Sequence, residues 1–92
     1  MNFGEAIEAL KEGKKVARSG WNGKGMFLYL VRGRAIDKEF LRNEASLQPI
    51  TNSTGVATFL SHIDMFTAQK TVNVGWLASQ TDMLSEDWVI VE

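Results

Sequence analysis

The amino-acid sequence predicts an α+β fold: a small, mainly antiparallel sheet with an N-terminal amphipathic helix and short additional helices. Three observations predict it. Apolar side chains recur at helical spacing near the N-terminus, several short segments have strand patterns, and turn-forming residues separate these elements. The 92 residues, 45% of them hydrophobic, are sufficient for one globular domain that spans residues 1–92.

The N-terminal helix is predicted by its boundary residues and by its apolar stripe. Asn2 can cap a helix, and Glu5 stands three residues later, at capping-box spacing. Gly13 is typical of a position just beyond a helix C-terminus. The helical stripe between these signals consists of Phe3, Ala6, Ile7 and Leu10. It needs a sheet or another helix to cover it.

Two strands and a loop are predicted next. Residues 15–18 have the pattern of a brief strand, and residues 19–25 contain three glycines around one tryptophan, as a loop would. Residues 26–32 are apolar on both alternating faces, so we expect a central strand that is covered on both sides. Gly33-Arg34 is expected to turn the chain.

The middle of the chain is predicted less completely than its two ends. Residues 37–47 have helical spacing, and the run from Pro49 to Gly55 indicates a loop. Residues 56–60 fit more than one kind of element.

The C-terminal part is predicted to contain a hairpin, a short helix and a strand. Residues 62–68 and 71–74 flank a turn at Gln69-Lys70 and predict the hairpin. Ser79 to Asp82 has capping-box spacing and predicts a helix that ends at Glu86. Residues 88–91 are rich in β-branched side chains and predict the final strand.

Composition excludes several kinds of site. Without cysteine the chain has no disulfide, thiolate zinc site or thiol nucleophile, and with one histidine, His62, it lacks the usual catalytic triad and multi-histidine metal sites. We therefore expect no metal and no cofactor. The longest apolar run, residues 26–31, is too short for a membrane span, which needs about 20 residues. We expect a cytoplasmic protein without a membrane partner.

The formal net charge of −1 conceals a strong asymmetry. Residues 1–10 carry −2, residues 11–42 carry nine basic against three acidic side chains, or +6, and residues 43–92 carry −5. Such a split suits an anionic partner, two halves that attract each other, or ordinary solvated faces. The acidic second half would repel a long nucleic acid, whereas a small anion meets less of that repulsion.

The loop from Arg18 to Gly25 is the first candidate ligand site. Its glycines leave backbone N–H groups accessible to phosphate oxygens, and Arg18 and Lys24 bracket it with positive charge. Trp21 offers a face on which a base could stack. The alternative is a turn whose tryptophan folds back over the core.

The second candidate lies between Gly75 and Met83, where Trp76 is followed by four polar side chains. These four, which suit a base edge, a ribose or an anion, are Ser79, Gln80, Thr81 and Asp82. The alternative is helix capping, with Trp76 in the core.

An enzyme is harder to build from these residues. Asp82, Glu86 and Asp87 could form a carboxylate pair for acid–base chemistry or Mg²⁺ binding, but two of them are sequence neighbours at a helix–strand junction. A lone histidine is more often structural than catalytic. We therefore expect no catalytic residues.

The two candidate segments also carry a resemblance. The runs MNFGEAIEALKEGKKVARSGWNGKGMFLYL and GWLASQTDMLSEDWVIVE resemble the two ends of a family of small phage and prophage proteins named for Thoeris anti-defence, type two. The resemblance covers residues 1–31 and 62–92, and it implies that residues 33–61, which match less well, are an insertion specific to this member.

The resemblance implies a sponge that binds a nucleotide immune signal without cleaving it. The signal is a glycocyclic ADP-ribose isomer made by bacterial Toll/interleukin-receptor-domain enzymes, and some relatives also hold cyclic oligonucleotide signals of the CBASS system. It further implies a homotetramer with ligand pockets at subunit interfaces, acting in the cytoplasm of the infected bacterium. The matching positions would supply stacking platforms, phosphate neutralisation and polar readers: Trp21, Trp76, Arg18, Lys24, Asn22, Ser79, Gln80 and Asp82. The alternative function is a protein–protein interaction module that inhibits a host defence protein directly.

Overall fold

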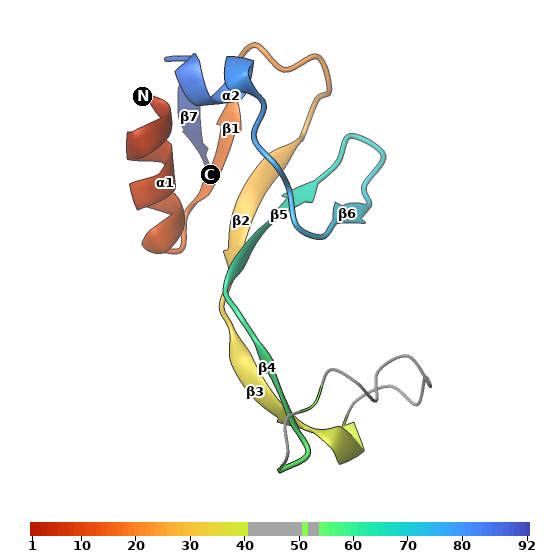
Figure 1. The fold of residues 1–92 in the computed structure, drawn as a ribbon. Coiled ribbons are helices and arrows are strands. Elements are labelled where there is room, and N and C mark those ends of the chain that lie inside the picture. Colours follow the sequence, from red (N-terminus) through yellow and green to blue (C-terminus); the bar gives the residue numbers. More distant parts are fainter. Residues whose placement is uncertain (41–50, 52–53) are drawn as a thin grey trace. The chain divides into compact units, whose positions relative to one another are not determined.

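The computed structural model describes residues 1–40, 51 and 54–92, which divide into two compact units (Figure 1). One unit consists of Met1–Val31 with His62–Glu92, and the other of Arg32–Ser61. Strands and helices occur together and every strand pair is antiparallel, so the predicted α+β class is confirmed. No helix among these residues is both long and apolar enough to cross a lipid bilayer.

The first unit begins with helix α1 (Phe3–Lys11), whose two ends match the sequence prediction. The Asn2 side chain accepts the Glu5 N–H at 2.8 Å, and the Glu5 carboxylate accepts the Asn2 N–H at 2.9 Å, so the capping box is complete. After the helix, Gly13 adopts a φ of 87°, a left-handed conformation that glycine tolerates without strain.

Five antiparallel strands form the sheet of this unit, in the order β6-β5-β2-β1-β7. They are β1 (Lys15–Arg18), β2 (Phe27–Val31), β5 (His62–Phe66), β6 (Val72–Asn73) and β7 (Trp88–Val91). The predicted hairpin is formed by β5 and β6, and Lys70 in its turn has a φ of 65°. The predicted central position of β2 is also confirmed.

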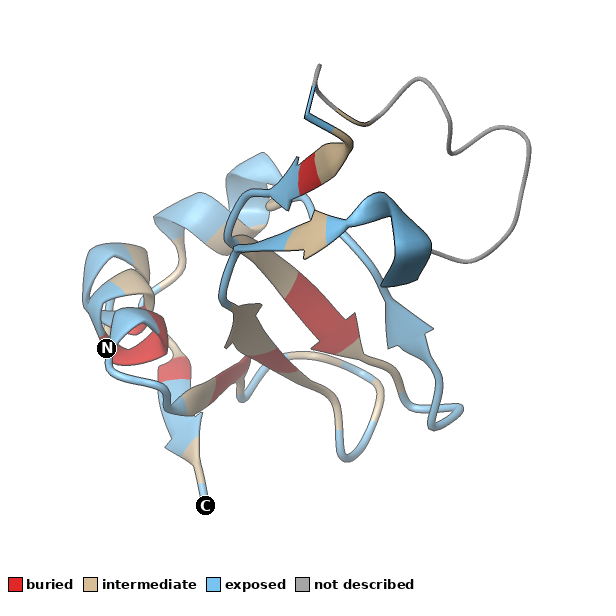
Figure 2. Cartoon of the chain, turned by 90° about the horizontal axis from the view of Figure 1, so that it is seen from below, coloured by how far each residue is buried: buried red, intermediate tan, exposed pale blue. Residues whose placement is uncertain are grey.

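The core lies between α1 and one face of this sheet. Val16 of β1 pairs with Leu28 of β2, and Leu28 pairs with Met65 of β5, so these three side chains share one face. All three are buried, as is the inner side of α1, where Ala6 and Leu10 lie (Figure 2). Helix α1 therefore covers this face, as its apolar stripe required.

The expectation that the central strand is covered on both sides is wrong for the described residues. Leu28 is fully buried, but Phe27 and Tyr29, which point to the opposite face, are only partly buried. Phe27 stacks on Phe66 with ring centroids 5.1 Å apart, and the Lys15 ammonium lies 4.9 Å from the Phe27 ring centroid. The second face of β2 is apolar because its aromatic side chains pack against one another on the sheet surface, and not because a second layer buries them.

The second unit contains a two-stranded sheet of β3 (Arg34–Asp37) and β4 (Val56–Phe59), with the 3₁₀ turn η1 (Lys38–Phe40). Arg34, expected in a turn, begins β3, and Asp37, expected in a helix, ends it. Both predictions are wrong, because pairing with β4 overrides the local pattern. Residues 41–47 of the predicted helix lie outside the described residues, as do Pro49 and part of the predicted loop.

Candidate functional site

Three tryptophans from distant parts of the sequence meet in the first unit. Trp21 follows β1, Trp76 lies between β6 and helix α2 (Gln80–Leu84), and Trp88 begins β7. The ring centroids of Trp21 and Trp88 are 5.4 Å apart, those of Trp76 and Trp88 6.2 Å, and those of Trp21 and Trp76 6.4 Å. All three pairs are edge-to-face, a favoured aromatic geometry. Trp88 is fully buried, whereas Trp21 and Trp76 keep part of their surface accessible.

A sharp turn after β1 places Trp21 in this cluster. The Trp21 N–H donates to the Arg18 carbonyl at 3.2 Å, and the Gly20 N–H donates to the Asp87 carboxylate at 2.9 Å. A Cβ at Gly20 would lie 2.7 Å from that carboxylate oxygen, so a larger residue at this position would displace the Asp87 side chain. The glycine-containing loop predicted from the sequence thus has a definite anchor, Asp87.

Arg18 lies between two carboxylates. Its Nε donates to Asp87 Oδ1 at 2.9 Å, and its Nη1 donates to Asp82 Oδ1 at 2.9 Å. The side chains of Arg18 and Asp82 are only 15% and 13% exposed. This double ion pair, here called the Arg18 bracket, consists of Arg18, Asp82 and Asp87. It carries one unbalanced negative charge.

The Arg18 bracket shifts the pKa of each of its members. The hydrogen bonds that Arg18 donates to Asp87 and then to Asp82 raise the pKa of Arg18. The Arg18 hydrogen bond is the main cause that lowers the pKa of Asp87. For Asp82, burial acts to raise the pKa, but hydrogen bonds from Arg18, Ser79 and Trp21 outweigh it, and the pKa is lowered. All three groups are therefore held in their charged forms.

Asp82 connects the bracket to helix α2 and to two of the tryptophans. It completes a capping box with Ser79: the Ser79 Oγ accepts the Asp82 N–H at 3.0 Å, and Asp82 Oδ2 accepts the Ser79 N–H at 3.2 Å. Asp82 Oδ1 also accepts the Trp21 Nε1–H at 3.3 Å, and its carbonyl accepts the Trp88 Nε1–H at 3.0 Å. The predicted capping spacing is confirmed, and the same carboxylate fixes the ring of Trp21.

The structure brings five of the ligand residues predicted from the sequence into one connected group and leaves the other three outside it. Arg18, Trp21, Trp76, Ser79 and Asp82 form one connected group. Asn22, Lys24 and Gln80 are exposed. Within the described part of the chain, the side chains of Asn22 and Lys24 have no hydrogen bond or ion pair.

Sequence reasoning missed the pairing within this group. The sequence predicts separate ligand roles for Arg18 and Asp82, whereas the structure pairs them with each other. For Asp87 the sequence suggests only acid–base chemistry or Mg²⁺ binding, yet its carboxylate accepts hydrogen bonds from both Arg18 and the Gly20 N–H. The charge asymmetry of the sequence could have indicated this pairing, because Arg18 lies in the basic segment and both aspartates lie in the acidic one.

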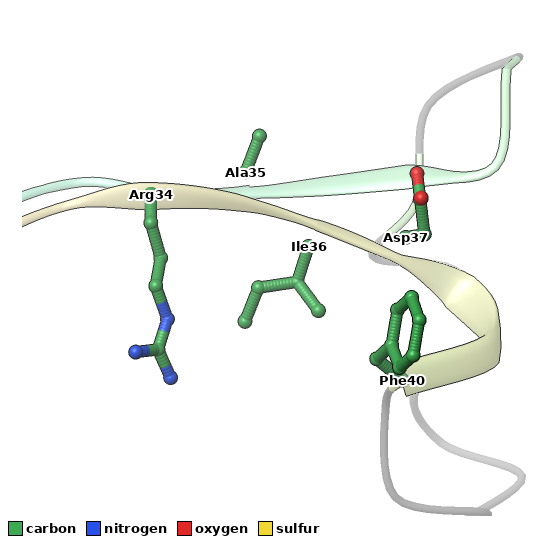
Figure 3. A pocket seen from close by; sticks show the side chains of 5 residues that line it. All are labelled: Arg34, Ala35, Ile36, Asp37 and Phe40. Carbon is green, nitrogen blue, oxygen red and sulfur yellow. The ribbon is translucent and has the colours of Figure 1, made fainter.

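The second unit has an open hollow of its own. Arg34, Ala35, Ile36, Asp37 and Phe40 line it, and Arg34, Ile36 and Phe40 lie on one side of β3 (Figure 3). Phe40 is 74% exposed. The hollow contains none of the ligand residues predicted from the sequence, and no carboxylate bracket or tryptophan cluster lines it.

Acid is expected to destabilise the fold by protonating the carboxylates of the Arg18 bracket. The pKa values of Asp82 and Asp87 are lowered from 3.8 by folding, so their contribution to stability is present above that value and is lost as the pH falls through the folded pKa values. We expect the melting temperature to fall below about pH 4, and to fall less steeply in Asp87→Asn. Circular dichroism melts from pH 7 to pH 2 measure this, with Glu92→Gln as the charge-matched control. An identical slope in Asp87→Asn and in the wild-type protein would contradict it.

Comparison with known proteins identifies similar sequences over nearly the entire chain. A family model described as the Thoeris anti-defense 2-like domain matches residues 1–91. The chain is also 44% identical, over 93 residues, to the protein named Thoeris anti-defense 2 of Bacillus phage SP01. That alignment covers 99% of this chain and 94% of the phage protein. Both matches span the tryptophan cluster and the Arg18 bracket.

Proposed function

Because this chain belongs to the Thoeris anti-defense 2-like family, we propose that it is a phage anti-defence protein that sequesters a cyclic nucleotide immune signal without cleaving it. The ligand in this proposal is a glycocyclic ADP-ribose made by the Toll/interleukin-receptor-domain enzymes of Thoeris systems. Cyclic di- or trinucleotides of CBASS systems are further candidates. Sequestration in the cytoplasm of the infected bacterium would leave the defence effector without its activator.

The observation that carries the proposal is the pair of partly accessible tryptophans, Trp21 and Trp76, beside the polar side chains of Ser79 and Asp82. Stacking of a base on an aromatic ring contributes about 1–3 kcal/mol. Trp88 supports both rings from the core, so the platform exists before a ligand arrives. A preformed platform avoids the cost of ordering side chains on binding.

The two basic residues of the proposed site differ in whether a carboxylate already neutralises them. Arg18 is already neutralised by Asp82 and Asp87, so a phosphate would have to compete with two carboxylates for it. Lys24 is exposed and has no such partner within the described residues. In our proposal Lys24 therefore meets the pyrophosphate first, and Asn22 and Gln80 read the base edge or ribose hydroxyls.

Binding without cleavage agrees with the state of the carboxylates near the tryptophans. A general acid needs a proton near neutral pH, and a general base works best with a pKa near the working pH. The pKa values of Asp82 and Asp87 are lowered, so these groups are ionised and weakly basic. Their hydrogen bonds to Arg18, Trp21 and Gly20 also occupy the oxygens that a substrate proton would need.

We include a homo-oligomer, with a tetramer favoured, in this proposal. Val74, Leu77 and Leu84 flank the segment that carries Trp76 and Asp82, and they are 75%, 89% and 79% exposed. Association of subunits would cover such side chains and could close the ligand pocket. The same exposed residues favour the second candidate function, a module that inhibits a host defence protein through direct protein contact.

Calorimetric titration with glycocyclic ADP-ribose isomers tests the proposal. We expect at least one isomer to bind with a Kd below about 10 µM, and linear ADP-ribose to serve as the control. The ligand should be recovered intact after the complex is denatured by heat. If folded protein binds no nucleotide but retains a host protein in pull-downs, the interaction module replaces the sponge. Recovery of a cleaved ligand would instead indicate an enzyme.

A further inference from the structure

Asp64 is a buried carboxylate that the proposed binding site does not use. It lies on β5 opposite Tyr29 and is only 4% exposed, and it is the one charged residue classed as buried within residues 1–40, 51 and 54–92. Removing a carboxylate from water is costly unless it is hydrogen-bonded or paired. The partners of Asp64 therefore indicate what it does.

Two hydrogen bonds attach the chain before helix α2 to strand β5 at successive residues. Asp64 Oδ1 accepts the Gly75 N–H at 2.9 Å, and the Ile63 carbonyl accepts the Trp76 N–H at 2.8 Å. The same carboxylate oxygen lies 3.5 Å from His62 Nε2. An N–H bonded to a carboxylate is held about twice as strongly as one bonded to a neutral acceptor.

The segment whose N–H groups donate these two hydrogen bonds has no regular secondary structure of its own. Residues 74–79 lie between β6 and α2 and belong to neither. Gly75 has a φ of 78°, which reverses the local chain direction immediately before Trp76. The ring of Trp76 meets Trp21 and Trp88 edge-to-face, and the attachment of its backbone to β5 restricts where the ring can lie.

We propose that Asp64 is the positioning residue for Trp76: its buried carboxylate holds Gly75 and thereby fixes Trp76 against the other two tryptophans before ligand binds. The binding consequence rests on the proposed function, because it takes Trp76 as a stacking platform. The positioning itself is a property of the free protein and can be measured without ligand.

The first arm of the test is amide hydrogen exchange, measured by NMR on the free protein. Asp64→Val removes the acceptor but keeps a β-branched residue suited to a strand. We expect exchange at the Gly75 and Trp76 amides to accelerate about tenfold or more, while the amides of β2 keep their rates. Asp64→Asn retains a neutral acceptor and should give a smaller, equally local acceleration. Asp37→Val, at an exposed strand position, is the matched control.

Uniform acceleration of all core amides, in either variant, would overturn the proposal, because Asp64 would then support the fold generally. If Asp64→Val does not fold, Asp64→Asn is used to test whether exchange accelerates only at Gly75 and Trp76 or at all core amides. Unchanged exchange at Gly75 and Trp76 in the folded variants would also overturn it.

The second arm is affinity for the glycocyclic ADP-ribose isomer that the wild-type protein binds. We expect Asp64→Val to raise the Kd about tenfold through faster dissociation, and Asp64→Asn to restore most of the affinity. If exchange at Gly75 and Trp76 accelerates but the Kd does not change, then the position of Trp76 does not affect ligand binding. If the wild-type protein binds no nucleotide, the proposed function fails, and the exchange arm alone then decides the positioning role.

Discussion

Replacement of Trp88 by alanine is expected to lower the free energy of unfolding by about 3–5 kcal/mol. Trp88 is fully buried and contacts the rings of Phe3, Trp21 and Trp76. Its indole N–H also donates to the Asp82 carbonyl, so the variant loses a hydrogen bond as well as its packing. A small domain has about 5–15 kcal/mol of stability in total, so this loss would remove a large fraction of it.

Urea unfolding followed by circular dichroism measures the effect, because the three tryptophans make fluorescence changes hard to compare between variants. Leu60→Ala is the control, since Leu60 is 80% exposed and its truncation should change stability by no more than about 0.5 kcal/mol. Equal loss of stability in the two variants would contradict the central place given to Trp88.

The elements predicted best from the sequence are those whose signals are local. The capping box of Asn2 and Glu5, the glycine after α1 and the capping spacing of Ser79 and Asp82 each involve residues a few positions apart. Such capping interactions form within a single turn of helix, so they can be predicted without knowing which other elements pack against that helix. Helices α1 and α2 were accordingly placed within one or two residues of their N-termini.

The elements predicted wrongly depend on what lies across the sheet. The apolar second face of β2 indicated a buried layer, but Phe27 instead pairs with Phe66 and with Lys15 at a partly accessible surface. Asp37 fitted a helical pattern, yet it pairs with Val56 in β3 and β4. Periodicity identifies apolar positions, but it does not identify the partner that covers them.

In the candidate site, too, local features could be predicted from the sequence but long-range contacts could not. Trp21, Trp76 and the polar residues after Trp76 were singled out because aromatic and polar side chains cluster in each segment. That the segments meet follows from the pairing of β1 with β7, in which Arg18 lies opposite Trp88. Arg18 then reaches Asp87, 69 positions away, a pairing that no local pattern contains.

The charge split takes on a more definite meaning in the folded chain. An anionic partner and mutual attraction of the two halves were both open interpretations. Arg18 with Asp82 and Asp87 is an instance of attraction between the halves. Lys24, in the same basic segment, has no carboxylate partner within the described residues and remains suited to an anion. The two interpretations therefore apply to different residues of one loop.

Substitution at Trp21 is expected to have the largest effect on ligand binding. Loss of one stacked ring costs about 1–3 kcal/mol, so Trp21→Ala should raise the Kd for the glycocyclic ADP-ribose isomer of the proposed function by about 5- to 150-fold. Trp21 is only partly buried, so the variant should remain folded, though less stable than the wild-type protein. Calorimetric titration below the melting temperature of each variant measures the Kd.

Trp21→Phe separates stacking from hydrogen bonding at this position. Phenylalanine keeps an aromatic face but loses the N–H that donates to Asp82, so a Kd close to that of the wild-type protein would identify the ring face as the contact. Affinity as poor as that of Trp21→Ala would assign the effect to the hydrogen bond and to the orientation of Asp82. If instead Trp21→Ala binds as tightly as the wild-type protein, Trp21 only packs against Trp88, and Trp76 must carry the stacking alone.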